Sequence, residues 1–233
     1  MRTLKRCHRT KIRLKCFICN TGCTLKYVNV YLSQQILNRH AIIYILCFLK
    51  GSFPSKNFYH EKLLTDKSVL VKYCPTDLEP YVLYDLKKSQ EIIIGNDGAF
   101  FNPVEADFVV ELCKRVQKSN QNYSIGVITP YQQQAQHLIS RVNPNEMPNV
   151  EIGTVDSYQG REKDIIIFSC VRAKSFDKKI GFLVNNQRLN VSLTRAKYGM
   201  YIVCHVDSLQ TGSDDWKNCI EDAKNRNLIK IVN

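Results

Sequence analysis

Length, composition and charge limit the class of protein. The chain has 233 residues, of which 44% are hydrophobic and 10% aromatic, so it can bury one substantial core and is not intrinsically disordered. The formal net charge of +12 is concentrated in residues 1–50, which contain ten Lys or Arg and no Asp or Glu. This leaves 23 of the 33 basic residues and all 21 acidic residues for the rest of the chain, which is nearly neutral. The basic stretch is either a phosphate-binding arm or a segment foreign to the fold, and we favour the second interpretation.

The cysteines fall into two groups. Six of the ten are scattered singly from Cys47 onward, which is typical of small core side chains in a reducing compartment, either nuclear or cytoplasmic. The other four lie near the start of the chain, where Cys16 and Cys19 have a spacing found in metal sites. A four-ligand zinc site would also require Cys23 together with Cys7 or His8, and this spacing matches no known zinc motif. We therefore predict that the chain has no metal site.

The longest apolar run, Ala41–Leu49, has nine residues, whereas a membrane-spanning helix needs about 20. It also lies too far from Met1 to be the core of a signal peptide. We predict a core helix or strand at this position and no association with a membrane.

The pattern of apolar residues predicts the elements that follow. Residues 51–100 are expected to be a loop-rich lead-in, with strands at 68–73 and 81–86. Regular alternation begins at Asn102, which can cap a helix with Pro103 in its first position. The same reading predicts strands at 125–129, 150–155, 164–170, 199–204 and 228–232, and helices at 132–142, 187–197 and 214–227. Apolar strands alternating with helices are typical of a parallel sheet with helices on both faces, here over residues 101–233.

Polar residues gather in three clusters beside the predicted strands: Thr129–Gln134, Thr154–Glu162 and Asn190–Lys197. Each alone can be explained as ordinary helix capping or turn formation. Because ligands of open α/β sheets bind at the carboxyl ends of strands, the three together predict one shared site. Glycine at position 160 permits close approach of a ligand, and the arginines of these clusters match phosphate oxygens. From spacing alone, Arg195 is better explained as a helix-surface arginine paired with a carboxylate.

Four segments resemble the C-terminal motor domain of superfamily 1 helicases: "IGVITPYQQQ", "VDSYQGREKDIIIFSCVRA", "IGFLVNNQRLNVSLTRAKYGMYIV" and "WKNCIEDAKNRNLIKI". The resemblance covers roughly residues 53–232 and is to the branch that contains the nonsense-mediated-decay helicase and senataxin. The last helix, and "TRAKY" followed by His205, are more similar to senataxin. The resemblance implies a RecA-like fold of the P-loop NTPase superfamily, namely the second of two motor lobes, which has no phosphate-binding loop of its own.

The resemblance also implies roles for individual residues. Arg195 matches the family's arginine finger and Glu162 a residue near the terminal phosphate, so both are catalytic candidates. Gly160, Arg161, Glu162 and Arg195 are expected to contact ATP, which is bound with Mg²⁺ in the complete two-lobe protein. The implied movement is 5′-to-3′ along single-stranded RNA or DNA. The residues that match the single-strand track are Thr129, Pro130, Tyr131, Gln134, Thr154, Asp156 and Ser157.

The sequence departs from the family in two places. It contains no G-x-x-x-x-G-K-[ST] motif and no acidic Mg²⁺-binding motif, so we expect that this chain alone does not hydrolyse ATP and needs a first RecA-like lobe. In addition, a Tyr-Arg-Met-His motif expected upstream is replaced by "YILC" at 44–47. Residues 1–50 are therefore predicted to be an atypical extension outside the fold, from a mis-predicted exon or translated intron.

Two other functions remain open at this point. The chain can be a non-catalytic nucleic-acid-binding or regulatory module, or an α/β protein that only scaffolds partners. Retention of Glu162 and Arg195 favours the motor lobe, because a module that only binds needs no arginine finger.

Overall fold

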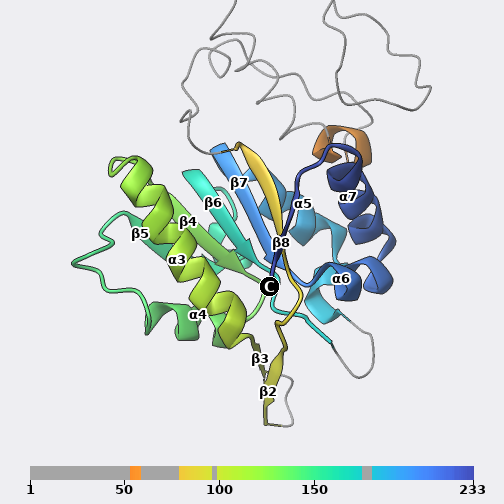
Figure 1. Cartoon of the computed structure of the whole chain (residues 1–233), viewed down its shortest axis with the longest axis horizontal. Helices are drawn as coiled ribbons and strands as arrows, with labels where there is room; N and C mark the ends of the chain where they lie inside the picture. Colours follow the sequence, from red (N-terminus) through yellow and green to blue (C-terminus); the bar gives the residue numbers. More distant parts are fainter. Residues whose placement is uncertain (1–52, 59–78, 96–98, 175–179) are drawn as a thin grey trace, which may run out of the picture.

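The described part of the chain is built around one parallel sheet. The computed structural model describes residues 53–58, 79–95, 99–174 and 180–233. Its main sheet has six strands in the order β5-β4-β6-β7-β1-β8, and every neighbouring pair is parallel (Figure 1). The strands are β1 (Tyr81–Leu86), β4 (Ile125–Thr129), β5 (Val150–Thr154), β6 (Lys163–Ser169), β7 (Ala196–Cys204) and β8 (Ile229–Val232).

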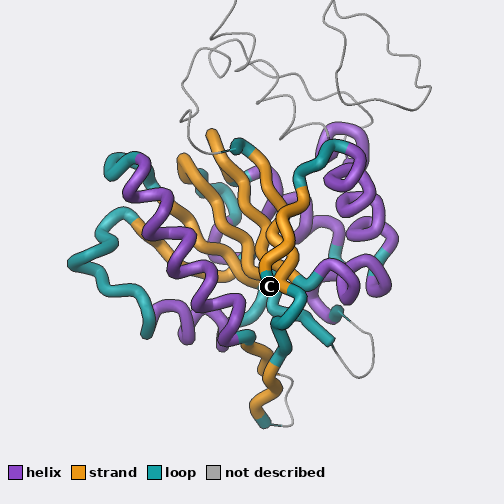
Figure 2. The backbone as a smooth tube through the Cα atoms, in the orientation of Figure 1, coloured by secondary structure: helices purple, strands orange, loops and turns teal. Residues whose placement is uncertain are grey.

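Helices cover both faces of this sheet (Figure 2). Helices α3 (Pro103–Ser119) and α4 (Gln132–Ile139) pack on one face, and α5 (Asn186–Thr194), α6 (Val206–Gly212) and α7 (Asp214–Asn225) pack on the other. Each face therefore has its own apolar cluster, and between them β1 and β4 are wholly buried and β6 is mostly buried, whereas the edge strands β5 and β8 are only partly covered. The predicted RecA-like α/β fold, with a parallel sheet and helices on both faces, is confirmed.

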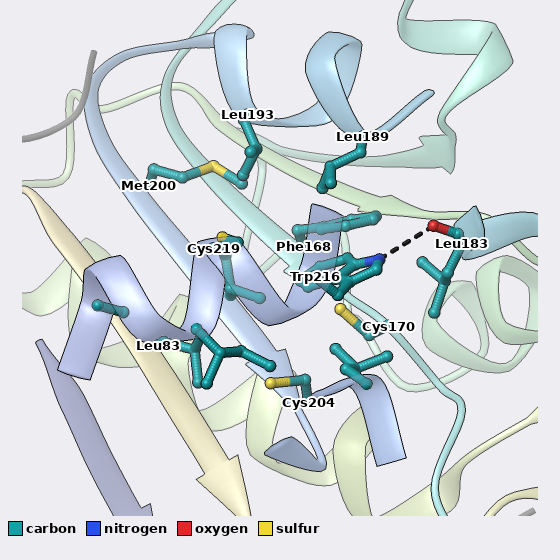
Figure 3. Close-up of a cluster of buried hydrophobic side chains, with 14 of the residues drawn as sticks. Leu83, Phe168, Cys170, Leu183, Leu189, Leu193, Met200, Cys204, Trp216 and Cys219 are labelled. Atoms are coloured by element: carbon teal, nitrogen blue, oxygen red, sulfur yellow. Dashed lines mark hydrogen bonds between the residues drawn. The ribbon is translucent and has the colours of Figure 1, made fainter. Parts of the chain in front are cut away.

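The α5–α7 face is centred on Trp216, whose side chain is fully buried (Figure 3). Its ring stacks on Phe168 of β6, with centroids 6.2 Å apart. Its indole Nε1 donates a hydrogen bond of 3.0 Å to the carbonyl oxygen of Leu183. Because this bond satisfies the polar atom of a buried indole, Trp216 fixes the segment around Leu183 to helix α7.

Most predicted elements are present, with shifted ends. Asn102 caps α3 by accepting a hydrogen bond from the backbone N–H of Glu105, with Pro103 in the first turn. The helix predicted at 187–197 ends three residues early, at Thr194, because Arg195 is its C-cap and Ala196 already pairs with Lys163 of β6. Helix α4 likewise ends at Ile139 and not at residue 142.

Several short elements were not predicted. Strands β2 (Ile92–Ile94) and β3 (Ala99–Phe101) form an antiparallel hairpin that projects beyond one end of the main sheet (Figure 1). Helix α6 was also missed. Each is too short to show a clear hydrophobic period, and the three isoleucines of β2 are all exposed, which alternation does not predict.

Several predictions fall on residues outside the described ranges: the strand at 68–73, the apolar run Ala41–Leu49 and the cysteine cluster near the start. Among the described residues, no helix is long and apolar enough to cross a membrane. Within the same residues, no group of three or more His, Cys, Asp or Glu is placed to hold a metal ion.

Candidate nucleotide and nucleic-acid sites

The structure places the three polar clusters at the two opposite ends of the strands. These ends are called the carboxyl edge, where the strands finish, and the amino edge, where they begin. Thr129 ends β4 and Thr154 ends β5, so both lie at the carboxyl edge. Arg161 and Glu162 immediately precede β6, and Arg195 immediately precedes β7, so these residues lie at the amino edge. The expectation that all three clusters share the carboxyl ends of the strands is therefore wrong, because Arg161, Glu162 and Arg195 lie at the amino ends.

The amino edge brings the two catalytic candidates together. The backbone N–H of Lys163 donates to the carbonyl oxygen of Arg195 at 3.2 Å, which makes Glu162 and Arg195 neighbours at the start of adjacent strands. Glu162 is exposed and, among the described residues, makes no hydrogen bond or ion pair with its side chain. Gly160 precedes them with a φ of +79°, and no atom lies within 4 Å of the position a Cβ would occupy. This edge therefore presents open backbone beside an accessible carboxylate.

The guanidinium of Arg195 is folded back onto its own helix. Its Nε donates to the carbonyl oxygen of Val191 at 3.1 Å, and its Nη2 donates to the Thr194 hydroxyl at 2.9 Å. Both acceptors are uncharged, and Arg195 forms no ion pair within the described part of the chain. The arrangement departs from the carboxylate-paired surface arginine that spacing alone had favoured. Within the described residues, the positive charge of Arg195 is therefore not neutralised by a carboxylate.

Arg161 differs from Arg195 because it already has a carboxylate partner. Its guanidinium binds Glu151 of β5, whose other oxygen lies 2.7 Å from the Nζ of Lys163. The guanidinium also lies over the ring of buried Tyr158, 5.3 Å from the centroid. The hydrogen bond from Lys163, followed by the two nearby positive charges, lowers the pKa of Glu151. Arg161 would have to leave this pair in order to bind a phosphate.

At the carboxyl edge, two threonines lie opposite each other on neighbouring strands. Thr129 and Thr154 are direct cross-strand partners, and the backbone N–H of Val155 continues the pairing by donating to the Thr129 carbonyl at 3.0 Å. The Thr129 side chain is buried, and its hydroxyl accepts a long bond from the N–H of Tyr131. Ser157 is exposed and donates to the carbonyl oxygen of Thr154 at 2.8 Å. Pro130, between Thr129 and Tyr131, is partly exposed.

Tyr131 begins the connection from β4 to α4 and is buried. Its hydroxyl donates to the carbonyl oxygen of Ile180 at 3.2 Å, and its ring makes edge contacts with Phe100 and Phe182. Burial raises the pKa of Tyr131, an effect that nearby Arg172 partly offsets. Tyr131 is therefore a neutral, hydrogen-bonded aromatic residue, buried just beyond the carboxyl end of β4.

Gln134 lies inside the protein and not on its surface. Its amide nitrogen donates to the Ser169 hydroxyl at 3.0 Å, and its amide oxygen accepts from the backbone N–H of Asn102 at 2.8 Å. Ser169 in turn donates to Glu105 at 2.7 Å. With both amide atoms engaged, Gln134 joins α4 to α3 and β6 and does not present its side chain to a ligand.

Asp156 is exposed and is bound by an arginine that sequence reasoning missed. Both carboxylate oxygens accept from Arg188 of α5, each at 3.0 Å. The Arg188 guanidinium also lies over the ring of Phe182, 4.8 Å from the centroid. These partners are 32 residues apart, so the only available signal was the position of Arg188 one turn into the helix of the "NNQRLNVSLTRAK" segment.

The sequence was compared with known proteins. The model of the family described as "AAA domain" matches residues 50–207. The chain is 35% identical over 185 residues to "Probable helicase senataxin" of Homo sapiens, covering 76% of this chain and 7% of that protein. It is 35% identical over 192 residues to "Helicase sen1" of Schizosaccharomyces pombe, covering 76% of this chain and 11% of that protein. It thus spans a small fraction of the length of these relatives.

A third relative is "Regulator of nonsense transcripts 1" of Dictyostelium discoideum, 34% identical over 192 residues, with 76% of this chain and 14% of that protein covered. The matched family model includes the strands and loops of both edges, from β1 through β7. The chain therefore belongs to the AAA-domain family, and it is a helicase-family C-terminal domain of the kind found in senataxin, Sen1 and the regulators of nonsense transcripts.

Proposed function

We propose that this chain is the second motor lobe of an ATP-dependent helicase that moves 5′-to-3′ along single-stranded RNA or DNA. In this proposal Arg195 is the arginine finger and Glu162 orients the attacking water or an arginine at the amino edge. The hydroxyl and backbone groups around Thr129, Thr154 and Ser157 hold the strand at the carboxyl edge. A first RecA-like lobe completes the nucleotide site.

The observation that carries this proposal is the connection between β5 and β6. Residues 155–162 run from the carboxyl edge, after Thr154, to the amino edge, before Lys163. The connection is anchored midway by Tyr158, which is fully buried and donates to the carbonyl oxygen of Glu151 at 2.8 Å. A short, anchored segment with one end at each edge is suited to transmit a displacement from the nucleotide site to the strand.

The residues of the amino edge fit a polyphosphate. Gly160 leaves space for a ligand beside the backbone, and the hydrogen-bond acceptors of the Arg195 cation within the described residues are neutral oxygens. When bound there, ATP supplies the phosphoryl group whose transfer drives the motor cycle. Arg195 would exchange its bonds to Val191 and Thr194 for phosphate oxygens and stabilise the charge that develops on them. No described residue is assigned to Mg²⁺.

The residues of the amino edge also favour a motor lobe over a module that only binds nucleic acid. Binding a strand at the carboxyl edge does not require an arginine at the opposite edge, and an exposed carboxylate beside Gly160 has no structural partner among the described residues. An intracellular location, nuclear or cytoplasmic, is part of this proposal, because the strand and the nucleotide are available there.

The proposal is tested on the full 233-residue chain by fluorescence anisotropy with labelled single-stranded RNA and DNA. We expect binding at low salt that weakens as salt rises and shows little sequence preference. No binding to either strand at low salt would favour a scaffolding role and remove the nucleic-acid half of the proposal.

The nucleotide half is tested by titrating a fluorescent ATP analogue into the chain and into Arg195→Ala. We expect weaker binding in Arg195→Ala and no change in the control Lys230→Ala. Lys230 lies on the edge strand β8 and is paired with Glu79. Equal affinities in all three proteins would contradict the assignment of Arg195. Nucleic-acid-stimulated ATP hydrolysis by the chain, lost in Arg195→Ala, would show that no first RecA-like lobe is needed.

A further inference from the structure

A hollow of about 620 Å³ lies at the carboxyl edge, and its lining is mainly aromatic and apolar. Phe100, Tyr131 and Phe182 contribute the aromatic faces, and Arg188 and Asn185 lie at its boundary. A second hollow of about 290 Å³ shares Asn185 and Arg188 and is otherwise mostly polar, with Asp156 and Gln159 among its lining residues. An aromatic hollow and a polar hollow therefore meet at Arg188.

The aromatic residues form a connected group around Tyr131. Its ring centroid is 5.3 Å from that of Phe100 and 5.9 Å from that of Phe182, with interplanar angles of 63° and 77°. Edge contacts of this kind fix the rings relative to one another. Phe182 completes the group yet is 52% exposed, so about half of one large aromatic side chain remains accessible.

The exposure of Phe182 is imposed by its neighbours. On one side, the carbonyl of buried Ile180 accepts the hydroxyl of Tyr131. On the other side, Leu183 is buried and its carbonyl oxygen accepts the indole N–H of Trp216 (Figure 3). Gly181 makes the turn between them with a φ of +54°, a conformation that other residues rarely adopt. Phe182 is thus presented from a segment that is hydrogen-bonded to the core at both ends.

Arg188 is fixed in the same way. The two bonds to Asp156 hold its guanidinium plane, and Phe182 lies against one face of that plane. The N-cap Asn185 accepts a hydrogen bond from the backbone N–H of Arg188, which fixes the start of α5 beside both hollows. The planar Arg188 cation and the exposed Phe182 ring are therefore fixed next to each other.

We propose that the aromatic hollow is a base-stacking subsite, which takes one unstacked nucleobase of a bound single strand, with Arg188 facing the adjoining phosphate. This inference rests on the proposed function and adds to it that one base is held directly. A nucleotide combines a flat base with a charged phosphate. The two adjoining hollows likewise combine a mainly aromatic lining with a mostly polar one. Bases of any sequence stack on aromatic and arginine faces. Thr129 and Thr154, the proposed strand contacts, lie at the same edge of the sheet.

The subsite is tested with the full chain and two labelled strands, an oligouridine and a strand of the same length in which abasic residues replace the nucleotides. We expect oligouridine to bind more tightly, by about tenfold for one stacked base. Phe182→Leu, which keeps an apolar side chain but removes the π face, should lose most of this difference and leave the affinity for the abasic strand unchanged. The control is Ile231→Ala, an apolar position on β8 that is 64% exposed, which should change neither affinity.

Photocrosslinking provides a second measurement. A strand containing 5-iodouridine should crosslink to Phe182, Tyr131 or Phe100, and the crosslink is located by mass spectrometry of the digested chain.

Three results would overturn the subsite. If both strands bind equally well to the unmodified chain, the bases are not held, although the proposed strand binding stands. If neither strand binds, the proposed function fails and the subsite fails with it. If Phe182→Leu leaves both affinities unchanged but abolishes self-association in sedimentation, the hollow belongs to an interface with a second copy.

Discussion

Arg172 and Glu91 form a buried ion pair beside Phe100 of the aromatic hollow, with the Arg172 Nε 2.7 Å from a Glu91 oxygen and both side chains about 95% buried. The same oxygen accepts the backbone N–H of Ala173, and the Arg172 guanidinium lies 4.1 Å from the centroid of Phe100. The pair therefore joins the start of the β2–β3 hairpin to the segment that follows β6. It also positions one wall of the proposed subsite.

Breaking this pair from one side should be costly. Arg172→Met leaves the Glu91 carboxylate buried without its cation, and we expect the free energy of unfolding to fall by about 3–5 kcal/mol. The double variant Glu91→Gln/Arg172→Met removes both charges and should be more stable than Arg172→Met alone. Urea denaturation of the wild type, both single variants and the double variant gives the interaction energy. Strict additivity of the two single effects would show that the pair is not coupled.

The exposed pair between Arg188 and Asp156 should behave differently, because its role is in binding. Surface pairs contribute about 0–1 kcal/mol, so Arg188→Ala should lower the free energy of unfolding by no more than about 1 kcal/mol. Its effect on single-strand affinity should be larger. The slope of the logarithm of the affinity against the logarithm of the salt concentration should become shallower by about one, as expected for the loss of one phosphate contact. Both quantities come from anisotropy titrations at several salt concentrations.

Arg141→Ala is a matched control for Arg188→Ala. Arg141 is 32% exposed and pairs with Asp107, which is 70% exposed, whereas Arg188 and Asp156 are 33% and 67% exposed. Both variants lose one charge and one exposed pair. A loss of affinity that is equal in the two variants would mean that only the total charge matters, and would contradict the placement of Arg188 at the strand.

The strands and helices of this fold were largely predictable, because long apolar segments such as β6 have only one stable location, inside the sheet. The edge that holds each polar cluster was also available from the sequence, since residues that directly precede a strand lie at its amino end. Glu162 and Arg195 precede β6 and β7, so they could have been separated from Thr129 and Thr154.

Other features were not available from local pattern. Asp156 meets Arg188, and Gln134 meets Ser169, only because helices α5 and α4 fold back against the sheet. A polar residue that ends in a buried network has the same sequence signature as one that faces a ligand. Gln134 was therefore assigned to the strand track from its motif, although its amide is used inside the chain.

The buried acid Glu105 should make stability depend on pH. Burial raises its pKa to about 8 from an ordinary value of 4.5, although hydrogen bonds from Val171 and Ser169 oppose the shift and nearby Glu91 adds to it. One of its oxygens, Oε1, has no hydrogen-bond partner among the described residues. Because the folded pKa is the higher one, the stabilising contribution is complete below the ordinary pKa. It is lost as the pH rises through about 8, by up to about 1.4 kcal/mol per pH unit.

Glu105→Gln should remove this dependence, because the amide stays neutral and can still accept from Val171 and Ser169. The measurement is the free energy of unfolding between about pH 5 and pH 9, where the variant should gain relative to the wild type as the pH rises. Glu111→Gln, on the exposed side of the same helix, should keep the slope of the wild type. A Glu105→Gln variant with the slope of the wild type would show that this carboxyl is already ionised in the folded protein.

Gly160 allows the effect of backbone strain to be separated from the approach of a ligand. Gly160 and Gly95 both have positive φ, +79° and +68°, and neither has an atom within 4 Å of the position of a Cβ. Each change to alanine should therefore lower the free energy of unfolding by about 1–2 kcal/mol, through backbone strain alone. Only Gly160 lies beside Glu162 and Arg195, so only Gly160→Ala should also weaken binding of a fluorescent ATP analogue. If Gly95→Ala weakens that binding to the same extent, the loss comes from reduced stability and Gly160 does not adjoin the nucleotide.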